Sequence, residues 1–176
     1  MASIGNVYIL NKPVFTKGSF RTDFKITYME EIPPKFTVFF AYDEKTRKGK
    51  GIKFFYDLDE TVKISLVDID CSLRQIEKTI EYTKKNAIKE DTFYPFLLNV
   101  ENKKAFGSVA GFEFSFDVES TKGRVAVERD NFIGELKLDS VAFSSDEEFK
   151  RITLMKKVSA DIPLVNGGDI PYRISC

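Results

Sequence analysis

The densest run of chemically active side chains in this sequence is basic. Between positions 45 and 53 the chain carries five cations and no acid: Lys45, Arg47, Lys48, Lys50 and Lys53. Such a run binds phosphate groups or an acidic lipid surface, near which each basic residue contributes about 1 kcal/mol. The same composition also suits a solvated hairpin tip, where glycines serve the turn and lysines discourage aggregation. We predict an anion-binding loop at these five residues, with the solvated tip as the alternative.

Carboxylates gather just after this run and are the second candidate site. Asp57, Asp59 and Glu60 precede Asp68 and Asp70, and hard cations such as Mg²⁺ and Ca²⁺ prefer such oxygens. Asp-x-Asp is common by chance, however, and the last two acids also lie where a helix start favours negative charge. We therefore predict no metal site.

Absent residue types exclude most catalytic chemistry. The chain has no histidine, so Ser-His and Cys-His nucleophile pairs and imidazole bases are impossible. Its serines occur in neither Gly-x-Ser-x-Gly nor a supported Ser-x-x-Lys context. We predict a protein that is not an enzyme, with no catalytic residue, no cofactor and no small-molecule substrate.

Length and charge indicate one compact unit with no general affinity for polyanions. The 176 residues carry 27 basic and 27 acidic side chains, a formal net charge of zero, and are interpreted as a single domain, 1–176. Only two cysteines occur, Cys71 and Cys176, the start lacks a signal pattern, and no apolar run approaches the ~18 residues that span a bilayer. These features predict an intracellular protein, soluble or peripheral to a membrane.

Period-two alternation predicts about eight short strands. They fall at 20–28, 36–42, 52–56, 61–67, 93–100, 112–118, 125–127 and 132–138. Ser120-Thr121-Lys122-Gly123 is interpreted as the hairpin turn between two of them.

Helical signals appear in one segment and, less clearly, in a second. Ser72 and Gln75 have capping-box spacing, and Leu73, Ile76, Ile80 and Ala87 form an apolar stripe, which predicts a helix over 72–86. A short second helix is indicated at about 145–152, although 151–158 reads equally well as a strand. The stretch 159–176, rich in glycine and proline, is predicted to be an irregular tail. The fold class predicted is α+β, mainly antiparallel sheet with one firm helix.

Phenylalanine, at 17 residues, is assigned mainly to the core. The alternative is an aromatic platform that stacks on the bases of single-stranded nucleic acid. In the clearest strand the polar positions between Phe112, Phe114 and Phe116 include Glu113 and Asp117, which would repel phosphate.

The middle of the chain resembles rhabdovirus-type (mononegavirus) matrix proteins over about a third of its length. The likeness follows the order of Lys53-Phe54-Phe55-Tyr56, Val62-Lys63-Ile64, the predicted helix from Ser72, and Phe93-Tyr94-Pro95-Phe96-Leu97-Leu98. The long basic N-terminal arm is missing, and Pro33-Pro34-Lys35-Phe36 is not a Pro-Pro-x-Tyr motif. The resemblance implies a self-associating structural protein of the virion and host cytoplasm, between membrane and nucleocapsid.

Three hypotheses therefore follow from the sequence, in this order. The first is a non-enzymatic assembly protein that self-associates and contacts an anionic lipid surface or a nucleocapsid through residues 45–53. The second is a β-sheet module that binds single-stranded nucleic acid. The third is a carboxylate-metal hydrolase.

Overall fold

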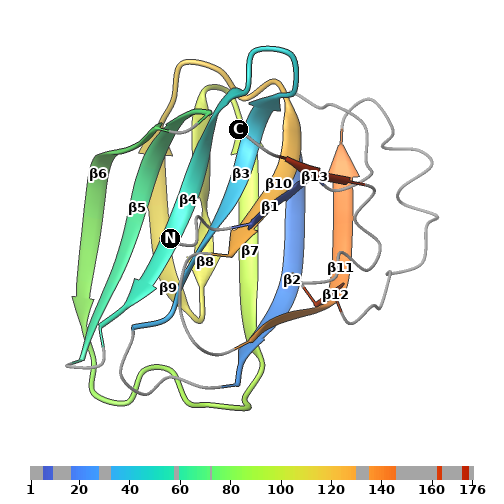
Figure 1. Ribbon diagram of the computed structural model, residues 1–176. Coiled ribbons are helices and arrows are strands. Elements are labelled where there is room, and N and C mark those ends of the chain that lie inside the picture. Colours follow the sequence, from blue (N-terminus) through green and yellow to red (C-terminus); the bar gives the residue numbers. More distant parts are fainter. Residues whose placement is uncertain are drawn as a thin grey trace.

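The chain folds into two antiparallel β-sheets that lie face to face (Figure 1). The computed structural model describes residues 6–9, 17–27, 33–57, 60–71, 73–129, 135–145, 162–163 and 172–174. Within these residues the elements are all strands, and no helix occurs. The α+β prediction is therefore wrong, and the fold is an all-β sandwich.

One sheet has seven strands in the order β13-β1-β10-β3-β4-β5-β6. In chain order its strands are β1 (Asn6–Ile9), β3 (Lys35–Asp43), β4 (Lys48–Tyr56), β5 (Thr61–Asp70), β6 (Leu73–Thr83), β10 (Arg124–Arg129) and β13 (Tyr172–Ile174). Strands β3 to β6 are joined consecutively, so this half of the sheet is a meander built from neighbouring sequence.

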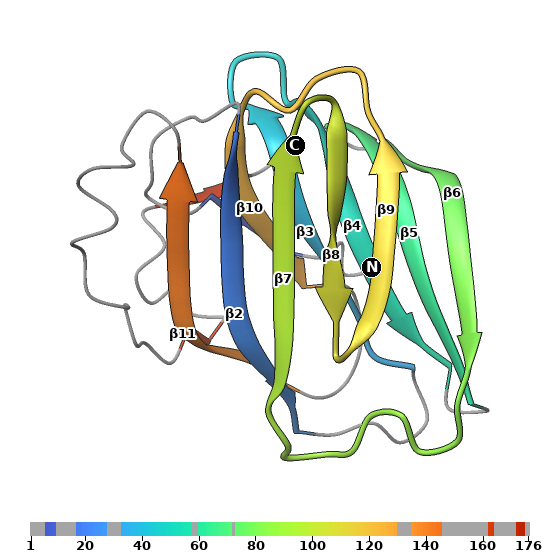
Figure 2. The same ribbon diagram turned by 180° about the vertical axis from the view of Figure 1, so that it is seen from behind.

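The other sheet has six strands in the order β12-β11-β2-β7-β8-β9 and faces the viewer in Figure 2. Its strands are β2 (Gly18–Ile26), β7 (Tyr94–Glu101), β8 (Lys104–Val109), β9 (Phe112–Asp117), β11 (Leu136–Ser145) and β12 (Ile162–Pro163).

Aromatic rings fill the space between the sheets. Phe24 on β2 lies with its ring centroid 5.0 Å from that of Phe36 on β3 and 5.7 Å from that of Phe54 on β4. All three side chains are 1% exposed or less. Since large aromatic rings supply much of the apolar burial in a β domain, these contacts hold the two sheets together. The assignment of most phenylalanines to the core is confirmed.

The predicted helix over 72–86 is wrong, because residues 73–83 form edge strand β6. This strand pairs with β5 along its whole length, with a bulge between the Leu66–Lys78 and Val67–Ile76 pairs. Of the apolar stripe expected of a helix, Leu73 and Ile76 are 69% and 57% exposed, whereas Ile80 and Ala87 are partly buried and pack against the core. Several β-branched residues favour the extended chain here, and pairing with a neighbouring strand overrides the helical spacing.

Only parts of the C-terminal segments predicted from the sequence fall within the described residues. Ser145 ends β11, and the rest of the second predicted helix, 145–152, lies outside the described residues, as does 151–158. The predicted irregular tail, 159–176, contributes the short strands β12 and β13, which pair with β11 and β1.

The turn predicted at residues 120–123 does not close a hairpin. β9 is an edge of the six-stranded sheet, whereas β10 lies between β1 and β3 in the seven-stranded sheet. The segment between them therefore crosses from one sheet to the other. This crossing brings it against the β3–β4 turn, where the candidate site lies.

Candidate functional site

A bulge in β3 shapes the end of the seven-stranded sheet. The pairing of β3 with β4 shifts between Phe40 and Asp43, and Ala41 has a positive φ of 53°. The extra residue turns Tyr42 away from the main core, so that its ring stacks on Phe39, with centroids 6.0 Å apart. Both rings belong to a second buried cluster, with Val67, Ile69 and Ala126.

Gly123 allows the β9–β10 connection to pass directly against this bulge. Its φ is +155°, and a Cβ atom there would lie 2.2 Å from the carbonyl carbon of Ala41. No side chain fits at that distance, so only glycine permits this close approach. The two segments, about 80 positions apart in sequence, thus become neighbours.

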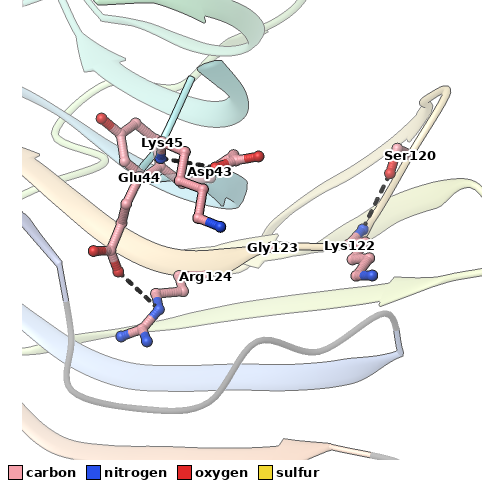
Figure 3. Close-up of a pocket in the computed structure, with 8 residues that line it drawn as sticks. Asp43, Glu44, Lys45, Ser120, Lys122, Gly123 and Arg124 are labelled. Atoms are coloured by element: carbon pink, nitrogen blue, oxygen red, sulfur yellow. Dashed lines mark hydrogen bonds and ion pairs between the residues drawn. The ribbon is translucent and has the colours of Figure 1, made fainter. Parts of the chain in front are cut away.

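A pocket of about 550 Å³ lies between these two segments (Figure 3). Its lining residues come from the end of β3 and the following turn, and from the β9–β10 connection: Tyr42, Asp43, Glu44, Lys45, Ser120, Lys122, Gly123 and Arg124. Apart from Gly123, every one of them carries a group that hydrogen-bonds.

The two carboxylates of the pocket are held by its own walls. Asp43 accepts a hydrogen bond from the backbone N–H of Lys45 at 2.8 Å, which fixes the turn. Glu44 pairs with Arg124, whose Nε lies 2.8 Å from Oε1, and this contact ties the two segments together. On the opposite wall, Ser120 Oγ accepts a bond from the backbone N–H of Lys122 at 3.3 Å.

Tyr42 carries the buried side chain of the lining, at 3% exposed. Burial disfavours the phenolate and raises the pKa of its hydroxyl, although the nearby guanidinium groups of Arg74 and Arg47 oppose this effect. The phenol therefore stays protonated at neutral pH.

The five predicted cations are dispersed by the structure. Lys45 lines the pocket, whereas exposed Arg47 directs Nη1 to Cys71 Sγ at 3.9 Å. Lys48 is exposed at the start of β4, and half-buried Lys53 lies opposite Thr37 and Ser65 in the strand register.

Lys50 is already neutralised within the sheet. Its Nζ lies 3.1 Å from Asp68 Oδ1 and also contacts Glu77. Burial by itself lowers the pKa of Lys50, but the hydrogen bonds to Glu77 and Asp68 outweigh that effect and raise it. An incoming anion would have to displace two carboxylates.

The acids weighed for a metal site do not converge. Asp57 follows the end of β4, while Asp68 and Asp70 lie at the opposite end of the β4–β5 pair. Asp59 lies outside the described residues. Among the described ranges no group of three or more Cys, Asp or Glu side chains is placed to hold a metal ion.

Sequence reasoning missed Glu44, Ser120, Lys122 and Arg124. No local sequence signal points to them, because they lie beside the β3–β4 turn only after the chain crosses from one sheet to the other between β9 and β10.

A second hollow of about 570 Å³ lies on the outer face of the six-stranded sheet. It is lined from β7, β8 and β9, with half-buried Phe106 beside Ser108, Glu113 and Ser115. It lies on a regular sheet face, in contrast to the pocket between the two loop segments.

Cys71 lies in the β5–β6 turn and is disulfide-bonded. Its backbone N–H donates to the carbonyl of Arg47 at 2.8 Å, so this turn lies beside the β3–β4 turn. In the part of the chain that the structure describes, no helix is long and apolar enough to span a membrane.

The fold is similar to that of a carbohydrate-binding module, an agglutinin and a galectin. A carbohydrate-binding module, CBM66 from Bacillus subtilis, superposes with a TM-score of 0.62 at 13% identity, over 81% of this chain and 84% of that one. CG-16, a homodimeric agglutinin from chicken liver, gives 0.53 at 14% identity over 80% and 99% of the two chains. Sheep galectin-11, in complex with glycerol, gives 0.51 at 11% identity over 81% and 99%. The sequence matches no protein-family model and no curated protein.

These likenesses overturn the expectations drawn from the resemblance to viral matrix proteins. The similar structures are lectin-like sandwiches, and the helix on which the resemblance depended is strand β6. The predicted virion assembly protein is wrong, and so are its lipid and nucleocapsid partners. Self-association stays a prediction, and the similar structure CG-16 is homodimeric. The nucleic-acid alternative is not supported either, since the phenylalanines that would stack on bases mostly fill the core. One of the similar structures is named as a carbohydrate-binding module and another as an agglutinin.

Proposed function

We propose that this protein binds carbohydrate, without catalysing a reaction, in the pocket between the β3–β4 turn and the β9–β10 connection. The observation that carries this proposal is the pocket itself, a hydrogen-bonding cavity built from two loop segments at one end of a lectin-like sandwich. Loops held by a rigid sheet framework are where binding sites concentrate.

The lining of the pocket matches the chemistry of a sugar. Each sugar hydroxyl both donates and accepts a hydrogen bond, so it needs acceptors and donors side by side. Glu44 and Arg124 supply a carboxylate and a guanidinium 2.8 Å apart, and Ser120 supplies a hydroxyl on the other wall. The volume of about 550 Å³ lies within the usual range for small-ligand sites.

The test is a direct binding measurement with variants of this pocket. Isothermal titration calorimetry with a panel of neutral and acidic oligosaccharides identifies a ligand. Ser120→Ala and Arg124→Ala are then expected to weaken its binding about tenfold each, because each removes a hydrogen bond that the bound sugar would use.

Matched substitutions in the second hollow serve as controls. Ser115→Ala and Lys104→Ala remove the same kinds of group from the outer face of the six-stranded sheet and should leave affinity unchanged. Loss of binding in these controls, with none in the pocket variants, would move the site to that face. A folded protein that binds no saccharide in the panel refutes the proposal.

A further inference from the structure

The acidic and basic side chains of the pocket differ in whether they already have a hydrogen-bond or ion-pair partner. The two acids are both engaged: Asp43 accepts from the backbone N–H of Lys45 at 2.8 Å, and Glu44 pairs with Arg124 at 2.8 Å. The charge of Glu44 is offset by Arg124, whereas Asp43 accepts from a neutral N–H and keeps its charge.

Two ammonium groups remain. Lys45 and Lys122 are exposed and stand on the two different segments that form the walls (Figure 3). Within the described residues no hydrogen bond or ion pair involves the side-chain nitrogen of either lysine. The backbone N–H of Lys122 is the group that Ser120 holds, and its ammonium stays available.

With Arg124, the lining holds three cations against two acids, so the pocket is electropositive although the whole chain is neutral. A cavity with net positive charge, whose two ammonium groups make no hydrogen bond or ion pair with the described residues, favours an anionic ligand group. Charge-assisted hydrogen bonds are about twice as strong as neutral ones. A neutral sugar would leave both lysines without a charge partner.

We infer that the ligand is an acidic saccharide, whose carboxylate binds Lys45 and Lys122 while its hydroxyls bind Ser120 and the Glu44–Arg124 pair. This inference rests on the proposed function and names the class of sugar. It also separates Lys45 from the other cations of positions 45–53. Lys50 is neutralised by Asp68 and Glu77, and Lys53 lies along β4, away from the turn.

The test compares uronate oligosaccharides from pectin, alginate and hyaluronan with their carboxyl-reduced counterparts, which keep the hydroxyls but lose the charge. Affinity for at least one uronate should exceed that for its reduced form by tenfold or more. It should also fall as sodium chloride is raised from 20 to 500 mM. The double variant Lys45→Gln/Lys122→Gln should lose at least tenfold in uronate affinity.

Lys85→Gln/Lys89→Gln is the matched control. Both lysines are exposed in the β6–β7 connection, and the strand directions place it at the opposite end of the seven-stranded sheet from the pocket. This pair should bind uronates as the unaltered protein does. An equal loss in both double variants would show general charge attraction only and would overturn the inference.

The remaining outcomes separate the inference from the function on which it rests. Equal affinity for uronates and their reduced forms, or uronate binding that survives Lys45→Gln/Lys122→Gln, overturns the inference and leaves carbohydrate binding in place. Absence of binding to either series by folded protein overturns both.

Discussion

Arg74 and Glu128 form an ion pair between strands that are not neighbours. Arg74 lies on edge strand β6 and Glu128 on β10, with β5, β4 and β3 between them in the sheet order. The Nη2–Oε2 distance is 2.8 Å, and the guanidinium carbon lies 5.8 Å from the centre of the Phe39 ring. The pair therefore spans the outer face of the seven-stranded sheet over the second buried cluster.

Removing the arginine should destabilise the fold. The Glu128 side chain is 5% exposed, so Arg74→Met removes a guanidinium that pairs with a buried carboxylate. We expect a loss of about 2 kcal/mol in the free energy of unfolding, measured by urea denaturation. The double variant Arg74→Met/Glu128→Gln should recover part of this loss. A single variant as stable as the unaltered protein would contradict the structural role of the pair.

The close approach at Gly123 predicts that an added side chain clashes with β3, and Gly111 provides the experimental control. Gly123→Ala places a methyl group against the backbone of Ala41 and should cost about 2–3 kcal/mol of stability. Gly111 also has a positive φ, +86°, but nothing lies within 4 Å of its added Cβ, so Gly111→Ala should cost only the backbone strain of about 1 kcal/mol. Equal losses at both sites would count against the packing of the β9–β10 connection on β3.

Ile76 and Ile64 distinguish the observed strand from the helix predicted over 72–86. Ile76 is 57% exposed on β6 and Ile64 is fully buried on β5. Truncation to alanine should change stability by less than about 0.5 kcal/mol at Ile76 and lower it by about 3 kcal/mol at Ile64. A large loss at Ile76 would indicate that this side chain packs in a core, as an amphipathic helix requires.

The raised pKa of Tyr42 predicts a specific dependence on alkaline pH. Burial raises the pKa of its phenol in the folded state, so the stabilisation is fully present below the unfolded pKa of about 10 and is lost as pH rises through the folded value. As pH rises above about 10, the free energy of unfolding should therefore fall less steeply for Tyr42→Phe than for the unaltered chain. Parallel pH profiles of the two proteins would show that Tyr42 titrates as an exposed tyrosine.

Local alternation was sufficient to predict most strands and their buried faces. Phe20, Phe24 and Ile26 of β2 are buried, as their two-residue spacing predicted, because side chains of a strand point to opposite faces in turn. Alternation failed where a bulge added a residue. Phe36, Phe40 and Tyr42 share one face in sequence, yet the bulge at Ala41 puts Tyr42 on the other.

Local composition was likewise insufficient to predict the site, as the basic run at positions 45–53 shows. Its composition predicted an anion-binding loop, but the β3–β4 pairing leaves only Lys45 and Arg47 in the turn and places the other three cations on β4, where acids from β5 and β6 neutralise Lys50. The pocket instead combines Lys45 with Lys122 and Arg124, about 80 positions further along. No spacing rule connects residues that become neighbours only when the chain crosses between sheets.

The sequence by itself determined eight of the extended segments and most of the side chains that they bury, because alternation and aromatic content act over a few residues. Tertiary structure alone decided that β6 is a strand, that β9 and β10 belong to different sheets, and that two distant loops enclose a polar pocket. These features depend on which strands pair, and pairing is set by contacts between residues far apart in the chain.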